Sequence, residues 1–276
     1  MKEFFVLSNG VKIPSVGFGT WQIPDGEDCY NSVMTAFKLG YRHIDTALAY
    51  GNERSVARAI KDSGLKREDV FIVTKLPAQY KTYEEAMKYF NESITNLGLD
   101  YIDLYLIHAP WPWSEIGKDC TEGNIAVWKA FVELYNAKKI RSIGVSNFRE
   151  SDIDAIVKAT NFVPHVNQIR YFISNTQDDV VSYCKKHNIL VEAYSPLGTG
   201  KLLDNPEINK MAAKYNVSPA RLCIKYCLQN DTLPLPKSTH ETRIKDNFDL
   251  DFEISQEDMN YLDKVEIKEL YRELRS

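Results

Sequence analysis

Four ionisable residues, placed at or just after short apolar runs, could together move a proton. They are Asp45, Tyr50, Lys75 and His108. Each one alone is explained more simply, as a loop cap, a solvated strand end, a buried histidine or one of sixteen tyrosines. Since they end or follow neighbouring apolar runs, they are expected to share one rim of the fold. A common site then explains the four residues better than four separate structural roles.

The chemistry of this group is the donation of a proton to an oxygen. A phenol has a pKa of about 10, and a buried ammonium beside it favours the phenolate and lowers that pKa. Lys75 would itself need a paired carboxylate when buried, which Asp45 supplies. A neutral His108 could orient a substrate oxygen. No activated Ser or Cys and no metal site accompanies the four, so the nucleophile is expected to be a cofactor's hydride.

A second cluster predicts an anionic ligand. The segment 194–201 is rich in glycine and hydroxyl residues, and the segment 236–243 places Lys237, Ser238 and Arg243 near the start of a helix. In barrels built from alternating strands and helices, the loops after the seventh and eighth strands often bind phosphate with a helix N-terminus. Two basic residues and several hydroxyls at this place favour an anionic ligand over an ordinary polar loop.

Eight short apolar runs alternate with amphipathic stretches along the whole chain. The predicted strands are 16–18, 41–44, 70–75, 101–107, 140–145, 165–168, 189–194 and 233–235. The predicted helices are 28–39, 52–63, 83–97, 124–137, 150–159, 176–187, 205–215, 218–229 and 242–248. Helix 83–97 repeats apolar residues at helical spacing and is bounded by Thr82 as N-cap and Gly98 as C-cap.

This alternation predicts an α/β fold, a (β/α)8 TIM barrel formed by residues 1–276 as a single domain. Before the first strand, 4–7 and 11–14 flank Ser8-Asn9-Gly10, which predicts a β-hairpin that caps the bottom of the barrel. An open doubly wound sheet shares the alternation and is the competing architecture. The barrel is preferred because the unusual residues fall at the carboxyl ends of strands.

Composition excludes several classes of function. The 276 residues are 44% hydrophobic and carry a net charge of −4, which gives no general attraction to nucleic acid or to anionic lipid. No apolar run approaches the roughly 20 residues that span a bilayer, and no signal peptide is recognisable. Five scattered cysteines fit reduced thiols, so a cytoplasmic location is expected, with a monomer as the default.

Two common cofactor motifs fail. Gly17-Phe18-Gly19 begins like a dinucleotide fingerprint, but Gln22 occupies the position of the third glycine. The five histidines show no helical pairing with another His, Cys or carboxylate at metal-ligand spacing, so no metal site is expected.

The whole chain resembles the aldo-keto reductases, on motifs that run from the hairpin to the last helix. They are Gly17-Phe18-Gly19-Thr20, Arg42-His43-Ile44-Asp45-Thr46-Ala47, Tyr50-Gly51-Asn52-Glu53, Val73-Thr74-Lys75, Leu99-Asp100-Tyr101-Ile102-Asp103-Leu104, Leu106-Ile107-His108, Ile143-Gly144-Val145-Ser146-Asn147-Phe148, Val166-Asn167-Gln168 and Pro236-Lys237-Ser238. The resemblance implies NADPH-dependent reduction of aldehydes and ketones to alcohols, reversible in principle. It makes Tyr50 the proton donor, tuned by Asp45 and Lys75, while His108 orients the carbonyl.

The resemblance also assigns residues to the cofactor. The expected contacts are Gly19, Thr20, Ser146, Asn147, Gln168, Tyr194, Ser195, Leu197, Lys237, Ser238, Arg243 and Asn247. Ser146, Asn147 and Gln168 would hold the carboxamide, with Tyr194 stacked on the nicotinamide. Lys237, Ser238 and Arg243 would bind the 2′-phosphate, which favours NADPH over NADH because a guanidinium suits bidentate phosphate contact. Arg170 and Asp246 depart from residues that are usual in the family.

The substrate side is expected to be small and open. Trp21, Trp111 and Trp113 would form an apolar wall near His108. Much of 255–275 is interpreted as helix, so a long closing loop at the C-terminus is not expected. This favours small aldehydes, ketoaldehydes or sugar-derived ketones as substrates.

Two alternatives remain open at this point. The first is a sensor or regulatory barrel that binds NADPH with little turnover. The second is a phosphate-binding barrel isomerase in which Lys75 acts as an electrophile. The complete set of four catalytic residues argues against the first, and neither explains the Lys237–Arg243 cluster and the proton-donating group together.

Overall fold

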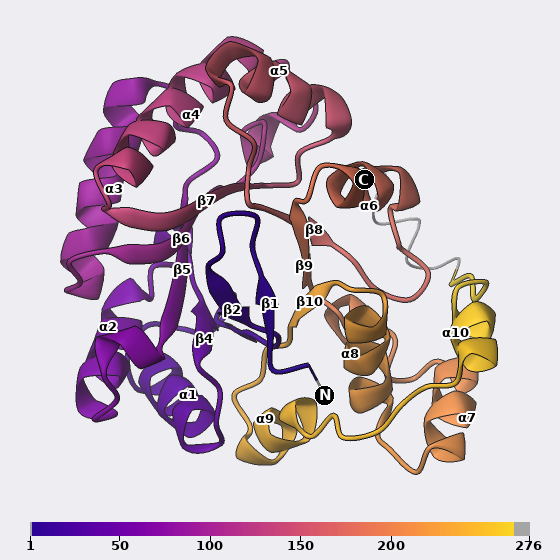
Figure 1. Cartoon of the computed structure of the whole chain (residues 1–276). Helices are drawn as coiled ribbons and strands as arrows, with labels where there is room; N and C mark the ends of the chain where they lie inside the picture. Colours follow the sequence, from indigo (N-terminus) through magenta and orange to yellow (C-terminus); the bar gives the residue numbers. More distant parts are fainter. Residues whose placement is uncertain (1, 268–276) are drawn as a thin grey trace.

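Eight parallel strands form the centre of the computed structural model, which describes residues 2–267 (Figure 1). In sheet order they are β3 (Phe18–Gly19), β4 (His43–Asp45), β5 (Phe71–Leu76), β6 (Ile102–Ile107), β7 (Ile140–Ser146), β8 (Val166–Arg170), β9 (Leu190–Tyr194) and β10 (Leu233–Leu235). Neighbouring strands pair in parallel register throughout, for example Gln168 with Glu192.

Helices connect the strands and surround them (Figure 1). They are α1 (Glu27–Lys38), α2 (Glu53–Asp62), α3 (Tyr83–Leu97), α4 (Thr121–Asn136), α5 (Glu150–Thr160), α6 (Asp178–Lys186), α7 (Pro206–Lys214), α8 (Pro219–Gln229), α9 (Glu241–Phe248) and α10 (Gln256–Leu262). Among residues 2–267 no helix is both long and apolar enough to cross a bilayer.

Backbone hydrogen bonds join the first and last strands and close the barrel. The amide of Gly17 donates to the carbonyl of Pro234 at 3.1 Å, and the amide of Gly19 donates to the carbonyl of Pro236 at 3.0 Å. The (β/α)8 barrel is therefore confirmed, and the open doubly wound sheet is wrong.

The predicted N-terminal hairpin is also present and covers one end of the barrel (Figure 1). Strands β1 (Phe4–Val6) and β2 (Lys12–Pro14) pair antiparallel, with Phe5 opposite Ile13. Phe5 and Ile13 pack against interior side chains of the barrel such as Val73 and Leu104. Burial of these apolar surfaces plugs the amino ends of the strands and leaves the opposite end for a ligand.

The two-residue period of the strands separates interior from exterior side chains. In β9, Val191 and Ala193 join the large apolar cluster between strands and helices, while Leu190 and Tyr194 face the interior cluster. Glu192 shares the inner face with Leu190 and Tyr194. The same alternation turns polar side chains of several strands into the barrel near its carboxyl end.

Local signals at α3 are confirmed. Thr82 and Glu85 form a reciprocal capping box, and Gly98 ends the helix in the left-handed conformation with φ 62°. These contacts satisfy backbone groups that a helix end otherwise leaves unpaired.

Several boundaries differ from those predicted. Strand β4 runs to Asp45, so this carboxylate is inside the barrel wall rather than in the loop after it. Of the helix expected over 255–275, the described residues contain α10, and 265–267 are not helical. Val265 and Ile267 are both buried, a spacing of two that an extended chain accommodates and a helix does not. Residues 268–275 of that prediction lie outside the described residues.

Candidate active site

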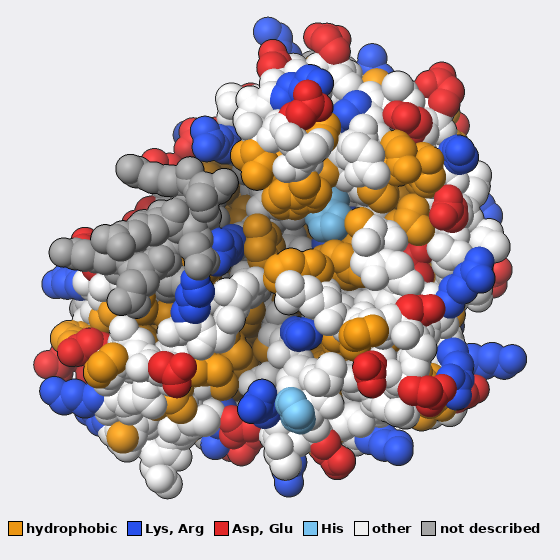
Figure 2. Space-filling model, turned by 180° about the vertical axis from the view of Figure 1, so that it is seen from behind, with side chains coloured by type: hydrophobic (Ala, Val, Ile, Leu, Met, Phe, Trp, Pro, Cys, Tyr) orange, Lys and Arg blue, Asp and Glu red, His pale blue; other side chains and the backbone are white. Residues whose placement is uncertain are grey.

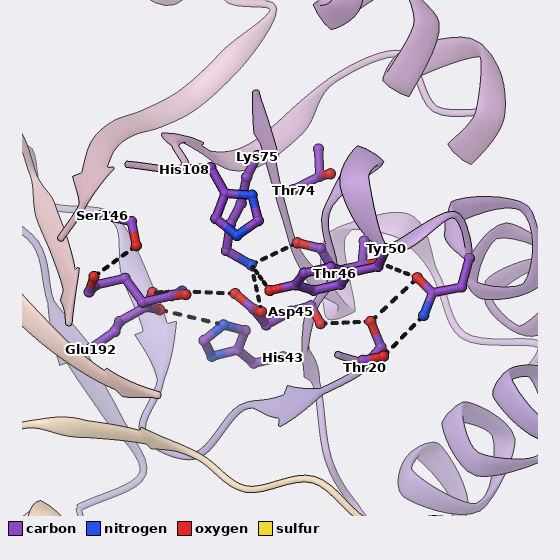
Figure 3. A network of polar contacts seen from close by, with 12 residues as sticks. Thr20, His43, Asp45, Thr46, Tyr50, Thr74, Lys75, His108, Ser146 and Glu192 are labelled. Carbon is purple, nitrogen blue, oxygen red and sulfur yellow. Dashed lines mark hydrogen bonds and ion pairs between the residues drawn. The ribbon is translucent and has the colours of Figure 1, made fainter. Parts of the chain in front are cut away.

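Lys75 is the centre of a hydrogen-bond network at the carboxyl end of the barrel (Figure 3). Its Nζ donates to Asp45 Oδ1 at 2.7 Å, to the Thr46 carbonyl at 2.8 Å and to Tyr50 Oη at 3.2 Å. Lys75 is 0% exposed. An ammonium has three N–H donors and no acceptor, so all of its donors are committed in this arrangement.

The pKa of Lys75 reflects two opposing effects. Burial lowers the pKa of its ammonium, but the negative charge of Asp45 and the contact with Tyr50 more than offset this, so the pKa is raised overall. Lys75 therefore stays charged at neutral pH.

Tyr50 lies in the 3-10 helix Leu48–Tyr50 that directly follows β4. Because Lys75 donates to its oxygen, the hydroxyl hydrogen of Tyr50 is free to point elsewhere. The expectation that Lys75 lowers the pKa of Tyr50 is only half correct. Burial of the ring raises that pKa, and Lys75 lowers it by less, so the net direction is upward and the phenol is protonated at neutral pH.

His108 follows β6 and faces Tyr50, with the two ring centroids 5.6 Å apart in an edge-to-face arrangement. Burial, and then the nearby Lys75, lower the pKa of His108 to about 3. The imidazole is therefore neutral, and its Nδ1 is buried with no hydrogen-bond partner among the described residues. A neutral ring has one N–H donor to offer to a ligand oxygen.

The residues expected around a nicotinamide carboxamide lie together. Tyr194 Oη donates to Asn147 Oδ1 at 2.8 Å, and Asn147 Nδ2 donates to Ser146 Oγ at 3.1 Å. Ser146 Oγ in turn donates to the carbonyl of Gln168 at 2.8 Å. The side-chain amide of Gln168 is directed inward, where its Nε2 donates to Asp45 Oδ2 and to Glu192 Oε2 at 2.8 Å each.

Gly19 and Thr20 serve the barrel itself. A Cβ on Gly19 would come within 3.3 Å of the carbonyl oxygen of Leu235, so glycine permits the close approach of β3 and β10. Thr20 is buried and its Oγ1 donates to the carbonyl of Asp45 at 3.0 Å. These contacts account for both residues structurally, and their contact with a cofactor stays a prediction.

The expected phosphate-binding residues belong to two loops and the start of α9. Ser195 has φ 52°, a left-handed conformation that is uncommon for residues other than glycine, and Leu197 is partly buried against the main core. Lys237 and Arg243 are exposed, whereas Ser238 and Asn247 are largely buried. Ser238 Oγ accepts the amide of His240, the residue before α9.

The expected aromatic wall is formed in part. Trp113 packs edge-to-face against His108 at 5.9 Å and against Trp111 at 5.1 Å between ring centroids. Trp21 and Trp113 are each 47% exposed, which leaves their faces available to a ligand. Figure 2, seen from the side opposite to the hairpin, shows a hollow bordered by hydrophobic side chains.

Three further polar residues that contact the site were not singled out from the sequence. His43 and Glu192 face each other inside the barrel, with Nε2 and Oε1 3.6 Å apart (Figure 3). Asn52 accepts from Thr46 Oγ1 at 2.7 Å and donates to the carbonyls of Thr20 and Ile23, which fixes the loop after β4. A lone acid two residues before Tyr194 on an apolar strand was the available signal for Glu192.

Within residues 2–267, no group of three or more His, Cys, Asp or Glu side chains could hold a metal ion. The arrangement thus combines a protonated phenol, a neutral imidazole and a set of amide and hydroxyl groups around one opening. It can donate a proton to a ligand oxygen and position a planar polar ligand beside it.

Known proteins share this sequence and fold. The sequence model of the Aldo/keto reductase family matches residues 15–267. A glyoxal reductase of Bacillus subtilis is 41% identical over 266 residues, which cover 96% of this chain and 93% of the relative. An aldehyde reductase of Saccharomyces cerevisiae is 39% identical, with 94% of this chain and 89% of the relative covered.

Solved structures agree. A crystal structure of an aldo/keto reductase from Brucella melitensis is 39% identical and superimposes with a TM-score of 0.88, covering 95% of this chain and 98% of the other. The match extends over nearly the whole barrel and includes the strands that carry the catalytic candidates. The chain therefore belongs to the aldo/keto reductase family of oxidoreductases.

Proposed function

We propose that this protein is an NADPH-dependent reductase that converts small aldehydes and ketones into alcohols, with Tyr50 as the proton donor. The observation that carries the proposal is the hydrogen bonding of Lys75. Its three donors are taken by Asp45, Thr46 and Tyr50, so the Tyr50 oxygen accepts and its own hydrogen remains available for a carbonyl oxygen.

The charge balance of the site supports this role. Reduction places negative charge on the carbonyl oxygen, and a proton from Tyr50 neutralises it. The phenolate left behind would be stabilised by the Lys75 ammonium, which Asp45 keeps charged. The high pKa of Tyr50 in the ligand-free protein keeps the proton in place until a carbonyl arrives.

The role proposed for His108 is to position the carbonyl oxygen of the substrate and not to donate a proton to it. With its pKa lowered to about 3, the ring is neutral at neutral pH. A neutral imidazole beside the ammonium can donate one hydrogen bond to the carbonyl oxygen and so direct this oxygen toward Tyr50. Trp113, packed against His108, would cover the apolar part of a small substrate.

The residues present fit a phosphorylated nicotinamide cofactor. Within residues 2–267 neither Lys237 nor Arg243 forms an ion pair with a carboxylate, and Ser238 Oγ accepts from the amide of His240, the N-cap of α9. The left-handed backbone of Asn147 and Ser195 marks the two loops where carboxamide and pyrophosphate are expected, since such conformations gather at ligand sites. When bound, the reduced nicotinamide supplies a hydride to the carbonyl carbon.

The relatives indicate the kind of substrate. The glyoxal reductase and the aldehyde reductase are 41% and 39% identical to this chain. Their names support small aldehydes and dicarbonyls, with sugar-derived carbonyls of similar size included in the proposal. We also infer that the protein works as a cytoplasmic monomer.

A sensor barrel with little turnover is the second candidate function. It requires cofactor binding but no proton donor, and nothing would then preserve the Asp45–Lys75–Tyr50 contacts. The family assignment offers no support to the isomerase alternative.

Replacement of Tyr50 by Phe tests the proposed function. Tyr50→Phe should lower kcat for carbonyl reduction by roughly 100-fold to 10,000-fold, because the ring keeps its shape and loses its proton. NADPH oxidation, followed by absorbance across a panel of small aldehydes and ketoaldehydes, measures this.

The Kd for NADPH, measured by fluorescence titration, should stay within about twofold in the variant, since Tyr50 lies on the carbonyl side of the site. Tyr83→Phe, on the outer surface, is the matched control. A wild-type protein that binds NADPH tightly and reduces no carbonyl of the panel would favour the sensor instead.

A further inference from the structure

A second carboxyl group lies beneath the catalytic residues, and the proposed reaction does not use it. Glu192 is 0% exposed and projects into the barrel from β9. Gln168, its neighbour in register on β8, donates from Nε2 to Glu192 Oε2 and to Asp45 Oδ2. One amide nitrogen thus joins the carboxyl of Glu192 to the carboxylate that holds Lys75.

The orientation of the Gln168 amide follows from its partners. An amide nitrogen has two N–H donors, and each is accepted by one carboxyl oxygen. With the amide reversed, its oxygen would face the charged Asp45, which can only accept. Glu192 Oε2 is therefore an acceptor, and any proton on Glu192 belongs on Oε1.

His43 faces Glu192 Oε1. Its Nδ1 lies 3.3 Å from the carbonyl oxygen of Pro14 in the hairpin. A carbonyl only accepts, so Nδ1 carries the hydrogen and, in the neutral ring, Nε2 carries a lone pair. This Nε2 lies 3.6 Å from Glu192 Oε1, and neither atom has a hydrogen-bond partner among the described residues.

This pair requires one proton between its two facing atoms. An ionised Glu192 opposite a neutral His43 would place two lone pairs against each other in the buried interior, at a high free-energy cost. A hydroxyl hydrogen on Oε1, directed at Nε2, removes the conflict and leaves every other bond of the network unchanged.

The charges around Glu192 decide which atom holds that proton. His43 and Asp45 of β4, Lys75 of β5 and Gln168 of β8 face it, while β10 presents Leu233. Burial, with Asp45 second, raises the pKa of Glu192 to about 8. Burial lowers the pKa of His43 to about 4. Both pKa shifts favour a proton on the carboxyl group of Glu192 and a neutral ring on His43.

We propose that Glu192 is a positioning residue that remains a neutral acid at neutral pH and, through Gln168, holds Asp45 as the one buried carboxylate paired with Lys75. Its ionisation at alkaline pH adds a second negative charge beside the Asp45–Lys75–Tyr50 chain. That charge makes Tyr50 a weaker acid and slows proton donation to a carbonyl. The effect on rate rests on the proposed function; the charge state of Glu192 does not.

The charge state can be measured on the cofactor-free protein. Infrared spectra of the wild type at neutral pH should show the carbonyl stretching band of a protonated carboxylic acid, and this band should disappear as the pH rises through about 8. Glu192→Gln should lack the band. Glu53→Gln should keep it, because Glu53 is a buried glutamate that accepts from Thr74 and Asn96 on the outer face of β5, opposite to the face that carries Lys75. No such band in the wild type would overturn the proposal, whether or not the variant folds.

The pH dependence of stability gives a second readout. The pKa of Glu192 is higher in the folded chain than its ordinary 4.5, so folding favours its protonated form and the resulting stability declines as the pH rises toward 8. His43 acts oppositely, but only below its ordinary 6.5. Between pH 6.5 and 8, the urea midpoint of the wild type should fall more than that of Glu192→Gln. Equal falls would contradict the proposal.

Kinetics then test the effect on the reaction. In the wild type, kcat for aldehyde reduction should fall as the pH rises above about 8. In Glu192→Gln the fall should begin at higher pH, so that the ratio of kcat at pH 9 to kcat at pH 7 is about threefold larger or more. Glu53→Gln should keep the wild-type profile. An unchanged profile in Glu192→Gln would refute the positioning role.

The two proposals fail in different ways. If the wild type reduces no carbonyl, the proposed function is wrong, while infrared spectra and unfolding still decide the state of Glu192. If Tyr50→Phe abolishes reduction and the Glu192→Gln profile matches the wild type, only the positioning role is wrong.

Discussion

The interior of the barrel and its rim use charge in opposite ways. Inside, Lys75 and Glu192 are 0% exposed, and each contacts named partners in the network around Asp45. On the rim, Lys237 and Arg243 are exposed and have no carboxylate partner within residues 2–267. Both regions are polar, yet only the first is already organised without a ligand.

This difference follows from desolvation. A buried charge is tolerated only with a partner and hydrogen bonds, so the groups proposed to act on the reacting oxygen are positioned during folding. An exposed cation keeps its water and can meet an anionic ligand at little cost to the free protein. Under the proposed function, the interior groups are already in place before a ligand binds, while the cations of the rim remain solvated until a cofactor arrives.

Loss of the buried ion pair between Lys75 and Asp45 should have the largest effect on both stability and activity. Lys75→Met leaves Asp45 as a buried carboxylate without its cation, which should lower the free energy of unfolding by about 3–5 kcal/mol and reduce kcat by at least roughly 100-fold. Urea unfolding and NADPH oxidation measure the two losses.

The double variant Lys75→Met/Asp45→Asn separates the loss of stability from the loss of activity. It should recover part of the stability, because no unpaired charge remains, and should stay inactive. Wild-type stability in Lys75→Met would mean that the ion pair is not the organising contact of the interior.

A rim cation should affect binding without affecting stability. Arg243→Ala should raise the Kd for NADPH by about 10-fold to 100-fold and change that for NADH much less, because a charge-assisted contact to the 2′-phosphate is lost. Fluorescence titration with both cofactors measures this. Lys245→Ala, on the same helix, is the matched control and should change neither Kd. An equal loss for both cofactors would place Arg243 elsewhere than at the 2′-phosphate.

The aromatic wall should show the smallest effect. Trp113→Ala removes a ring that packs on His108 and Trp111, and should raise KM for apolar aldehydes by roughly threefold to tenfold. The Kd for NADPH should not change, since the ring is on the substrate side. Ile116→Ala, in the same loop and 69% exposed, is the control. A change in cofactor affinity equal to the change in KM would show that Trp113 supports the whole rim.

Much of the site was predictable because chemistry in barrels is confined to strand ends. Asp45, Lys75 and His108 each end or follow an apolar run, and the structure brings all three together with Tyr50. Gln168 was predicted at the right place on β8 but not with its inward contacts. Those contacts depend on strand register, which single-sequence patterns do not specify.

The sequence by itself determined the alternation of strands and helices, the N-terminal hairpin, the capping of α3 and the residue types of the proposed proton-donating group. These features depend on local patterns of hydrophobicity, turn residues and residue type. Only the tertiary structure decided that Glu192 meets His43 and that Gln168 joins it to Asp45, residues more than a hundred positions apart in two of these pairs. It also decided that burial outweighs Lys75 in setting the pKa of Tyr50, because desolvation depends on everything packed around a group and not on its neighbours in the chain.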